Sequence, residues 1–432
     1  MLDFVSNGNE EIVMNLMEDL RYRGLVNQCT DEEGLGQLLS EEKIRFYLGF
    51  DPTADSLHIG SLVAILLLRR FQLAGHTPMP LVGGATGLIG DPKPGAERTL
   101  NSHEVVTGYV EKIKQQLSHF LSFEDGVENR AIPVNNYDWT KDMDIMTFLR
   151  DVGKYFNINY MLSKEVVQSR LDTGISYAEF SYMVLQSFDY LTLYRNYNCV
   201  LQLGGSDQWG NLTAGHELIR KVVPGSKVFA MTFPLVTKAD GTKFGKTESG
   251  TIWLDRTMTS PYEFYQFWFN SDDRDIIKYM KYYSFLPKEE IEKYAELVEK
   301  EPQKRAAQKA LAEELTTLVH GEEALEQALK ISDALFSGDI KSLTIEEIHQ
   351  GFKDVPTAVV AKDEKSLVEL LVVGKVVPSK RQAREDITNG AIYINGERCT
   401  DVDYEIKPED QFGGEMTIIR KGKKKYFMLK FE

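Results

Sequence analysis

The beginning of one helix carries residues that could bind a phosphate. The stretch "YLGFDPTADSLHIGSLVAILLLRR", residues 47–70, starts as a strand, turns at a proline and continues as a helix, with His58 and Gly60 where that helix begins. A helix N-terminus offers unpaired N–H groups and partial positive charge to an anion. His58 adds a donor there, and Gly60 allows a ring or a ribose to approach the backbone. Taken alone, His58 and Gly60 are more commonly explained as an exposed histidine next to a glycine that only allows close packing.

A second motif, "TKADGTKFGKTESG" at residues 237–250, has Lys243 and Lys246 on either side of a glycine, followed by Thr247. Ammonium groups on a loop can close over a polyphosphate and neutralise charge that builds up in a transition state. The spacing is not GxxxxGK[ST], so a P-loop kinase or GTPase has little support. A plain surface loop is the usual explanation of a lysine–glycine segment.

Polar residues also occur on one helix face and at the ends of strands. In "EFSYMVLQSFDYLTLY" the residues Tyr182, Gln186 and Asp189 are spaced i, i+4, i+7, so they share a face that turns either to a site or to water. Carboxylates at strand ends can pair with an ammonium or a ribose hydroxyl, and glutamines can hold a carboxylate or ribose, although Asp beside Gly or Pro is also common in turns. The strand-end candidates are Tyr47, Asp51, Asp91, Gln202, Asp207 and Gln208.

The first 250 residues alternate apolar strands with helical stretches, which predicts an α/β domain with a parallel sheet. Strands are expected in "KIRFYLGFD", "HTPMPLVGGATG" and "NCVLQLGGSDQWGN", the last followed by a helix to about Val223. The helix in "SLHIGSLVAILLLRRFQLAG" has Asp55 or Ser56 as N-cap candidates and Gly75 beyond its end. Ligands of such sheets bind beyond the carboxyl ends of the strands, where the glycine turns fall.

After residue 259 the composition and the predicted secondary structure change twice. Residues 260–351 are rich in Glu, Lys and Ala and predict a helical domain, including "EPQKRAAQKALAEELTTLVHG" with Pro302 near a helix start and Gly321 at its end. Residues 352–365 are interpreted as a linker. Residues 366–432 predict a small α+β domain containing the basic helix "PSKRQAREDITNG".

Composition limits the class of protein. A chain of 432 residues is too long for one core, and its 42% hydrophobic and 27% charged residues are ordinary for a soluble protein. The apolar run 62–68 is too short for a membrane span, and the acidic N-terminus lacks a signal pattern, so a cytoplasmic protein is expected. The three cysteines form no CxxC pair. The net charge is −15, yet residues 374–432 hold 12 Lys and Arg against 10 Asp and Glu, as expected of a module that touches phosphates.

These motifs together resemble one enzyme family. His58-Ile59-Gly60 before a long helix and "KFGKT" at 243–247 resemble the two signature motifs of class I aminoacyl-tRNA synthetases. "VGGATGLIGDP", "EFSYMVLQSFDY" and "LQLGGSDQWGN" resemble blocks of bacterial-type tyrosyl-tRNA synthetases, and "PSKRQAREDITNGAIYINGE" resembles their S4-like RNA-binding module. The resemblance implies a Rossmann-like catalytic domain over 1–259, a helical anticodon-binding domain over 260–351, the linker, and an S4-like domain over 366–432.

The resemblance also implies a role for each matching residue. Tyr47 and Asp189 match the pair that binds the substrate phenol. Residues around the substrate ammonium and the rest of the amino-acid pocket are matched by Tyr182, Asp91, Gln186, Gln202 and Gln208. ATP would be bound through Thr53, His58, Gly60 and Asp51, with Asp207 on the ribose, Leu235 and Val236 at the adenine, and Lys243, Lys246 and Thr247 on the pyrophosphate loop. Tyr177 falls where related dimers pack together.

The implied reaction activates L-tyrosine with Mg²⁺–ATP to tyrosyl-adenylate and pyrophosphate, then transfers the tyrosyl group to the 3′-terminal adenosine of tRNA(Tyr). A cytoplasmic homodimer is expected, with no membrane partner, no tightly bound cofactor and no protein-ligated metal.

Three features depart from the family pattern. Ser61 replaces the second motif histidine, and "KFGKT" differs from KMSKS. The loop after Asp91 is one residue short, which leaves the roles of Lys93 and Arg98 open.

Three other functions are alternatives to tyrosine–tRNA ligation for a sequence with these motifs. A tryptophanyl-tRNA synthetase shares the fold and both signatures, but Tyr47 with Asp189 and the S4-like tail favour tyrosine. A non-catalytic RNA-binding relic would have no reason to keep the intact set His58, Asp91, Asp207, Lys243 and Lys246. An adenylate-forming nucleotidyltransferase that does not use tRNA is opposed by the helical domain and the basic tail.

Overall fold

The computed structural model describes residues 15–93, 98–242, 244–247, 250–353, 355–422 and 425–432. The chain forms two compact units, one of residues 1–245 with 272–307 and the other of residues 246–271 with 308–432. Within the described residues, no helix is long and apolar enough to cross a membrane.

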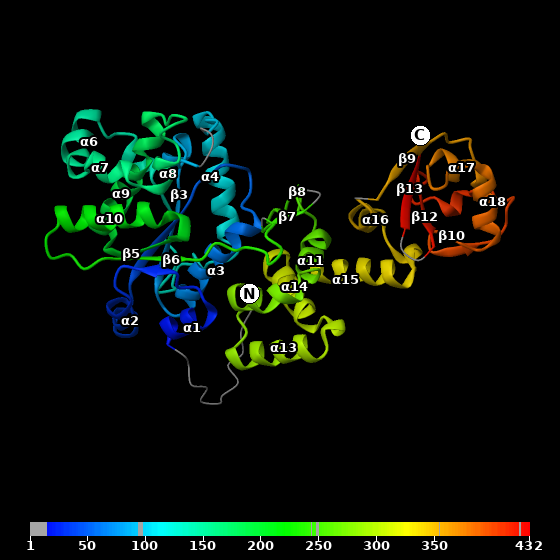
Figure 1. Cartoon of the computed structure of the whole chain (residues 1–432), viewed down its shortest axis with the longest axis horizontal. Helices are drawn as coiled ribbons and strands as arrows, with labels where there is room; N and C mark the ends of the chain where they lie inside the picture. Colours follow the sequence, from blue (N-terminus) through cyan, green and yellow to red (C-terminus); the bar gives the residue numbers. More distant parts are fainter. Residues whose placement is uncertain (1–14, 94–97, 243, 248–249, 354, 423–424) are drawn as a thin grey trace. The chain divides into compact units, whose positions relative to one another are not determined.

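The first unit is built on a six-stranded sheet with the order β1-β6-β5-β2-β3-β4 (Figure 1). Neighbouring strands are parallel except for β1 and β6, which confirms the predicted parallel α/β architecture. The strands are β1 (Gln28–Cys29), β2 (Arg45–Phe50), β3 (Thr77–Val82), β4 (Val134–Asn135), β5 (Cys199–Gly205) and β6 (Phe229–Phe233).

The strand order reverses between β2 and β5, which makes this the point where a ligand is expected. From β2 the chain passes through α3 (Ile59–Leu73) to β3 on one side, whereas from β5 it passes through α10 (Trp209–Val222) to β6 on the other. Right-handed crossovers then place these two helices on opposite faces of the sheet. In Figure 1, α9 (Tyr177–Tyr197) and α10 lie to one side of the strands, and α3 and α4 (His103–Leu117) to the other.

The start of α3 differs from the prediction. The N-cap is His58, whose imidazole Nδ1 accepts a hydrogen bond from the backbone nitrogen of Gly60 at 3.0 Å. The N-cap candidates Asp55 and Ser56 were wrong, because Asp55 forms an ion pair with Lys112 and the Ser56 hydroxyl donates to the carbonyl of Leu57. Every side chain from 62 to 68 is buried, so α3 is a core helix.

Shorter elements complete the first unit. They are α1 (Leu16–Arg23), α2 (Glu32–Glu41), η1 (Thr86–Leu88), α5 (Tyr137–Thr140), α6 (Ile145–Asp151), η2 (Gly153–Tyr155), α7 (Ile158–Leu162), α8 (Glu165–Gln168), η3 (Ser206–Gln208), α12 (Asp273–Tyr283), α13 (Lys288–Lys300) and η4 (Pro302–Lys304). Pro302 therefore lies in a separate 3₁₀ turn, and the helix expected from it begins later. The helices α12 and α13 belong to the unit of the parallel sheet.

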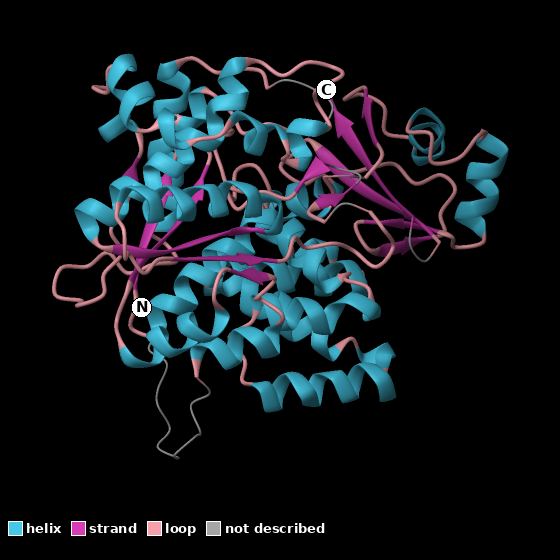
Figure 2. Cartoon of the chain, turned by 60° about the vertical axis from the view of Figure 1, so that its left-hand side comes forward, coloured by secondary structure: helices cyan, strands magenta, loops and turns pink. Residues whose placement is uncertain are grey.

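The second unit combines helices with a small sheet, whose strands are among those coloured magenta in Figure 2. Its helices are α11 (Pro261–Phe269), α14 (Ala306–His320, most of which lies in this unit), α15 (Glu322–Ser337), η5 (Ile340–Ser342), α16 (Ile345–Gly351), α17 (Leu367–Val373), α18 (Lys380–Thr388) and η6 (Pro408–Asp410). Its strands are β7 (Lys246–Thr247), β8 (Gly250–Thr251), β9 (Thr357–Val360), β10 (Ile392–Ile394), β11 (Glu397–Cys399), β12 (Met416–Lys421) and β13 (Lys425–Phe431).

The five-stranded sheet, of order β11-β10-β12-β13-β9, includes part of the segment interpreted as a linker. Strand β9 pairs in parallel with β13, and the side chain of Val360 is buried in the core of this small domain. Residues of the Thr-Ala-Val-Val run in β9 favour a strand, but the polar and charged residues on either side of it are typical of a linker, so the sequence did not predict the strand. The predicted basic helix is α18, with Ala383 and Ile387 buried and Lys380, Arg381 and Arg384 exposed.

Candidate active site

A buried carboxyl group marks one end of the site. Asp189 on α9 is only 3% exposed, and its two oxygens accept hydrogen bonds from Trp139 Nε1 at 2.8 Å and Asn136 Nδ2 at 3.0 Å. Burial raises the pKa of Asp189 to about 7. The sequence reasoning missed Asn136 and Trp139. The only feature that could have pointed to these two residues is their position directly after β4, at the same edge of the sheet as the other candidates.

Beside Asp189, three polar atoms are buried without a hydrogen-bond partner among the described residues: Tyr47 Oη, Gln186 Oε1 and Gln202 Oε1. Tyr47 on β2 lies directly opposite Gln202 on β5, and Gln186 lies one turn before Asp189 on α9. The Asp189 charge and burial both raise the pKa of Tyr47. An unsatisfied buried polar atom costs roughly 1–3 kcal/mol, so three on the neighbouring strands β2 and β5 and on α9 indicate a place for a polar ligand.

The predicted polar face of α9 does not turn to water. Tyr182 and Asp189 are both buried, and the Tyr182 hydroxyl donates to Asp51 Oδ2 at 2.6 Å. Asp51 Oδ1 accepts from Thr86 Oγ1 at 2.9 Å, and Thr86 in turn accepts from Asn136 Nδ2 at 3.0 Å. A continuous series of hydrogen bonds therefore links Asp189 to Asp51 through Asn136 and Thr86.

A second carboxyl group, that of the half-buried Asp91, lies near the Asp51 end of this series. Its oxygens accept from Gln208 Nε2 at 2.8 Å and Asn211 Nδ2 at 3.2 Å. Burial raises the pKa of Asp91 to about 6, and the charge of Asp51 adds to the shift. Burial also raises the pKa of Asp51. Clustered carboxyl groups of this kind suit the ammonium group of an amino acid.

A cavity of about 590 Å³ adjoins these residues, and its lining includes Asp91, Met183, Ser206 and Asp207. That volume is typical of a small-molecule site. Leu235, which follows β6, lies on the same side: a Cβ placed on Gly205 would be 2.7 Å from Asp207 Oδ1 and 3.3 Å from Leu235 Cδ2. Leu235 is 54% exposed and Val236 is half-buried.

A larger groove of about 900 Å³ lies at the opposite edge of the sheet, where Arg45 begins β2 and Val200 lies early in β5. None of the candidate residues lines it. The candidate polar side chains therefore gather at the carboxyl ends of the strands, where the sequence leads us to expect them.

The two signature motifs meet at the start of α3. His58 and Thr53 are exposed there, and the hydrogen bond that His58 Nδ1 accepts fixes the imidazole hydrogen on Nε2. Gly245 has φ +77°, and a Cβ placed on it would lie 2.7 Å from Ile59 Cγ2 and 3.8 Å from the Gly60 nitrogen. Only glycine can bring the backbone so close. Gly245 of the second motif therefore lies against Ile59 and Gly60 of the first.

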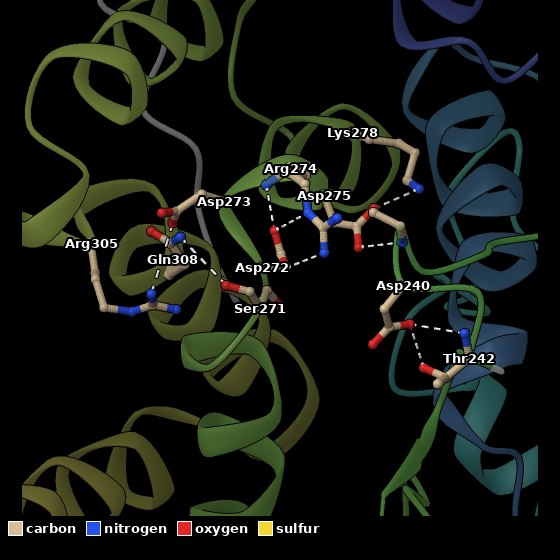
Figure 3. A network of polar contacts seen from close by, with 11 residues as sticks. Asp240, Thr242, Ser271, Asp272, Asp273, Arg274, Asp275, Lys278, Arg305 and Gln308 are labelled. Carbon is tan, nitrogen blue, oxygen red and sulfur yellow. Dashed lines mark hydrogen bonds and ion pairs between the residues drawn. The ribbon is translucent and has the colours of Figure 1, made fainter.

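Helix α12 contacts the loop of residues 237–242, which precedes "KFGKT", and Figure 3 shows Asp275 and Lys278 of this helix beside that loop. Asp275 Oδ2 accepts from the Ala239 nitrogen at 2.8 Å, and Lys278 Nζ donates to the Thr237 carbonyl at 2.7 Å. Lys243 lies outside the described residues, as do the side chains of Lys246 and Thr247. Among the described residues, no group of three or more His, Cys, Asp or Glu side chains is arranged to hold a metal ion.

Comparison with known proteins agrees with this geometry. Residues 39–337 match the family model described as "tRNA synthetases class I (W and Y)", and residues 347–429 match "Tyrosine--tRNA ligase SYY-like C-terminal domain". The chain is 64% identical to tyrosine–tRNA ligase 1 of Bacillus subtilis, over 97% of this chain and 100% of that relative.

Solved structures point the same way. A C-terminally truncated mitochondrial tyrosyl-tRNA synthetase of Aspergillus nidulans is 31% identical, with a TM-score of 0.67 over 75% of this chain and 94% of that one. A tryptophanyl-tRNA synthetase of Plasmodium falciparum, 16% identical with a TM-score of 0.51 over 77% of this chain and 87% of that one, shares the fold alone. The chain therefore belongs to the class I aminoacyl-tRNA synthetases and, within them, to the bacterial-type tyrosyl-tRNA synthetases, which ligate tyrosine to tRNA.

Proposed function

We propose that the chain activates L-tyrosine with ATP in the cleft between Asp189 and His58, and then passes the tyrosyl group to tRNA. The single observation that supports this best is that Tyr47 Oη, Gln186 Oε1 and Gln202 Oε1, on the elements around Asp189, are buried and find no hydrogen-bond partner among the described residues. A tyrosine supplies a phenol hydroxyl at one end and an ammonium and carboxylate at the other, which is the complement of this pocket.

In the proposed binding mode, the phenol hydroxyl donates to Asp189 and contacts Tyr47. The ammonium group lies among Asp91, Tyr182 and Gln186, while Gln202 and Gln208 line the rest of the amino-acid pocket. Phenylalanine would leave the buried Asp189 and Tyr47 without a partner, and the pocket discriminates against it for this reason. Tryptophan should be rejected as well, because nothing in an indole matches both an acceptor and a hydroxyl at this end.

ATP would lie across the start of α3. Asp207 holds the ribose and Leu235 and Val236 flank the adenine, while Asp51 and Gly60 border the nucleotide. His58, Thr53, Lys243, Lys246 and Thr247 act on the phosphates. Mg²⁺ enters as part of the ATP substrate complex and adds charge neutralisation.

The tyrosine carboxylate attacks the α-phosphorus, the bond to the bridging oxygen breaks, and pyrophosphate leaves. No side chain becomes a nucleophile, because positioning and electrostatic stabilisation supply the rate. His58 Nε2–H and the loop cations stabilise the charge that gathers on the leaving pyrophosphate. In the second step, a ribose hydroxyl of the 3′-terminal adenosine attacks the tyrosyl carbonyl, and AMP leaves.

We assign the remaining roles to whole segments. Residues 1–259 form the catalytic domain, 260–351 the anticodon-binding domain and 366–432 the S4-like RNA-binding domain, where the exposed basic face of α18 meets RNA phosphates. The enzyme acts in the cytoplasm.

We further propose a homodimer. Six large apolar side chains between residues 145 and 177 are 44–73% exposed, which is unusual for surface positions: Ile145, Met146, Leu149, Ile158, Leu171 and Tyr177. A second copy of the chain would cover them.

Isolation of the intermediate tests the proposed reaction. The enzyme is incubated with labelled L-tyrosine and Mg²⁺–ATP, passed over a gel-filtration column, and then mixed with tRNA(Tyr). Label that co-elutes with the protein as tyrosyl-adenylate and moves to tRNA supports the proposal. Label that reaches tRNA without such an intermediate would contradict it.

A further inference from the structure

We propose that helix α12 is the support that positions the described part of the phosphate-binding loop, residues 237–242 and 244–245, for adenylate formation. Asp275, Lys278, Tyr279 and Tyr283 are then positioning residues, since they act through the loop and touch no substrate. This inference rests on the proposed function of that loop. The sequence alone gave no reason to expect it, because residues 260–351 contain no cluster with catalytic character.

Polar contacts fix the beginning of the loop (Figure 3). The buried carboxylate of Asp275 accepts from the Ala239 nitrogen at 2.8 Å and from Lys278 Nζ at 2.9 Å. Lys278 Nζ also donates to the Thr237 carbonyl at 2.7 Å. One carboxylate and one ammonium thus bind backbone groups two residues apart, a stronger restraint than either contact alone because charged partners strengthen hydrogen bonds.

Aromatic contacts fix the loop again five residues later. The ring of Phe244 is buried and stacks on Tyr283, with centroids 5.9 Å apart and planes 16° apart, and lies 5.3 Å from the ring of Tyr279. Tyr279 and Tyr283 are one helical turn apart, so they form one face of α12. The neighbouring Gly245 is the residue that reaches Ile59 and Gly60.

The loop is therefore held at two points by one helix, and the second point, Phe244, is adjacent in sequence to Lys243, a residue proposed to act on pyrophosphate. Holding cations in place before the reaction lowers the reorganisation that the transition state requires. The residues proposed to bind tyrosine lie on β2, β5, α9 and η3 and, for Asp91, in the loop after η1, so none of them is on α12. Loss of the support should thus slow adenylate formation and leave tyrosine affinity unchanged.

The experiment compares Asp275→Ala and Lys278→Met with two matched controls on the same helix. Asp272→Ala removes the N-cap of α12, whose carboxylate binds Arg274, and so weakens the helix while leaving the hydrogen bonds to Thr237 and Ala239 in place. Lys281→Met removes an ammonium that lies over the ring of Tyr22. For each full-length protein we would measure tyrosine-dependent ATP–pyrophosphate exchange, tyrosine affinity by equilibrium dialysis, and the thermal midpoint.

We expect kcat for exchange to fall about 10- to 100-fold in Asp275→Ala and about 5-fold or more in Lys278→Met, with tyrosine Kd within about twofold. Both controls should keep exchange within about twofold, even though Asp272→Ala lowers the thermal midpoint. Normal exchange in Asp275→Ala, or an equal loss in Asp272→Ala, would overturn the inference. Absence of tyrosine-dependent exchange in the unaltered enzyme would instead refute the proposed function, so the two failures are distinguishable.

Discussion

The imidazole Nδ1 of His58 accepts a hydrogen bond from the backbone nitrogen of Gly60 at 3.0 Å. The same side chain thus caps the helix and directs its Nε2–H away from the helix backbone. A cap and a phosphate donor are two separable functions of one residue, and substitutions can distinguish them.

Asparagine at position 58 should keep the cap and lose the donor, because its side-chain oxygen can accept from the helix N–H. We therefore predict that His58→Asn slows exchange at least tenfold while the free energy of unfolding stays within about 0.5 kcal/mol. His58→Ala should slow exchange similarly and also lose about 1 kcal/mol of stability. Urea unfolding beside exchange kinetics checks both, and a stable, fully active His58→Asn enzyme would remove His58 from the chemistry.

Asp189 provides the second prediction. Asp189→Ala removes the acceptor proposed for the phenol and leaves Asn136 and Trp139 without the carboxylate that they now bind. Tyrosine affinity should fall by about 100-fold or more, whereas ATP affinity should change less than about threefold. Separate equilibrium measurements with each ligand check this prediction. Equal losses for both ligands would show that Asp189 supports the whole fold instead.

The raised pKa values of Asp189 and Asp91 predict a dependence on pH. Burial favours the neutral forms of both carboxyl groups and raises the pKa of Asp189 to about 7 and that of Asp91 to about 6. The phenol hydroxyl and the ammonium group of tyrosine both favour ionised carboxylates. Binding should therefore release protons, and tyrosine Kd should be lowest near about pH 8, where both carboxyl groups are ionised and the ammonium group of tyrosine is still charged, and rise as the pH falls through 7 and 6.

Calorimetry in two buffers of different ionisation enthalpy measures this proton release directly. Asp91→Asn should remove the component near pH 6 and keep the one near pH 7. Tighter tyrosine binding at low pH would have the wrong sign for this account.

Lys246 tests the loop itself. We predict that Lys246→Ala reduces the rate of adenylate formation by about 100-fold or more, since a cation on the leaving pyrophosphate acts mainly in the transition state. Tyrosine affinity should barely change. A normal exchange rate in this variant would exclude the loop from the mechanism.

The exposed apolar side chains near Tyr177 test the proposed dimer. Tyr177 is 73% exposed, so an aspartate there should not disturb the fold of one chain but should place a charge in the interface. Sedimentation equilibrium should find a dimer for the unaltered enzyme and a monomer for Tyr177→Asp at micromolar concentration. Identical masses for the two would place the interface elsewhere or rule it out.

The sequence located the elements of the site better than its details. The strand ends and the spacing of Tyr182, Gln186 and Asp189 predicted that these side chains gather at one edge of the sheet, because periodicity and glycine turns are local properties. Asn136 and Trp139 escaped notice since they follow a two-residue strand, which has no periodicity to detect. Their partner Asp189 is some fifty residues away in the chain.

Other differences also come from long-range contacts. Asp55 and Ser56 have the residue types of an N-cap, but their side chains bind elsewhere and His58 caps α3 instead. The composition of α12 resembles that of the helices after it, whereas its contacts with residues 237–244 place it in the unit of the parallel sheet. No local pattern reveals such a contact.

The most direct test of the central claim is ATP–pyrophosphate exchange with each of the twenty amino acids supplied singly. A cleft that binds a phenol at Asp189 and a triphosphate at His58 predicts exchange with tyrosine and only background with phenylalanine, tryptophan and the rest. Exchange supported by tryptophan, or by none of the twenty, would contradict it.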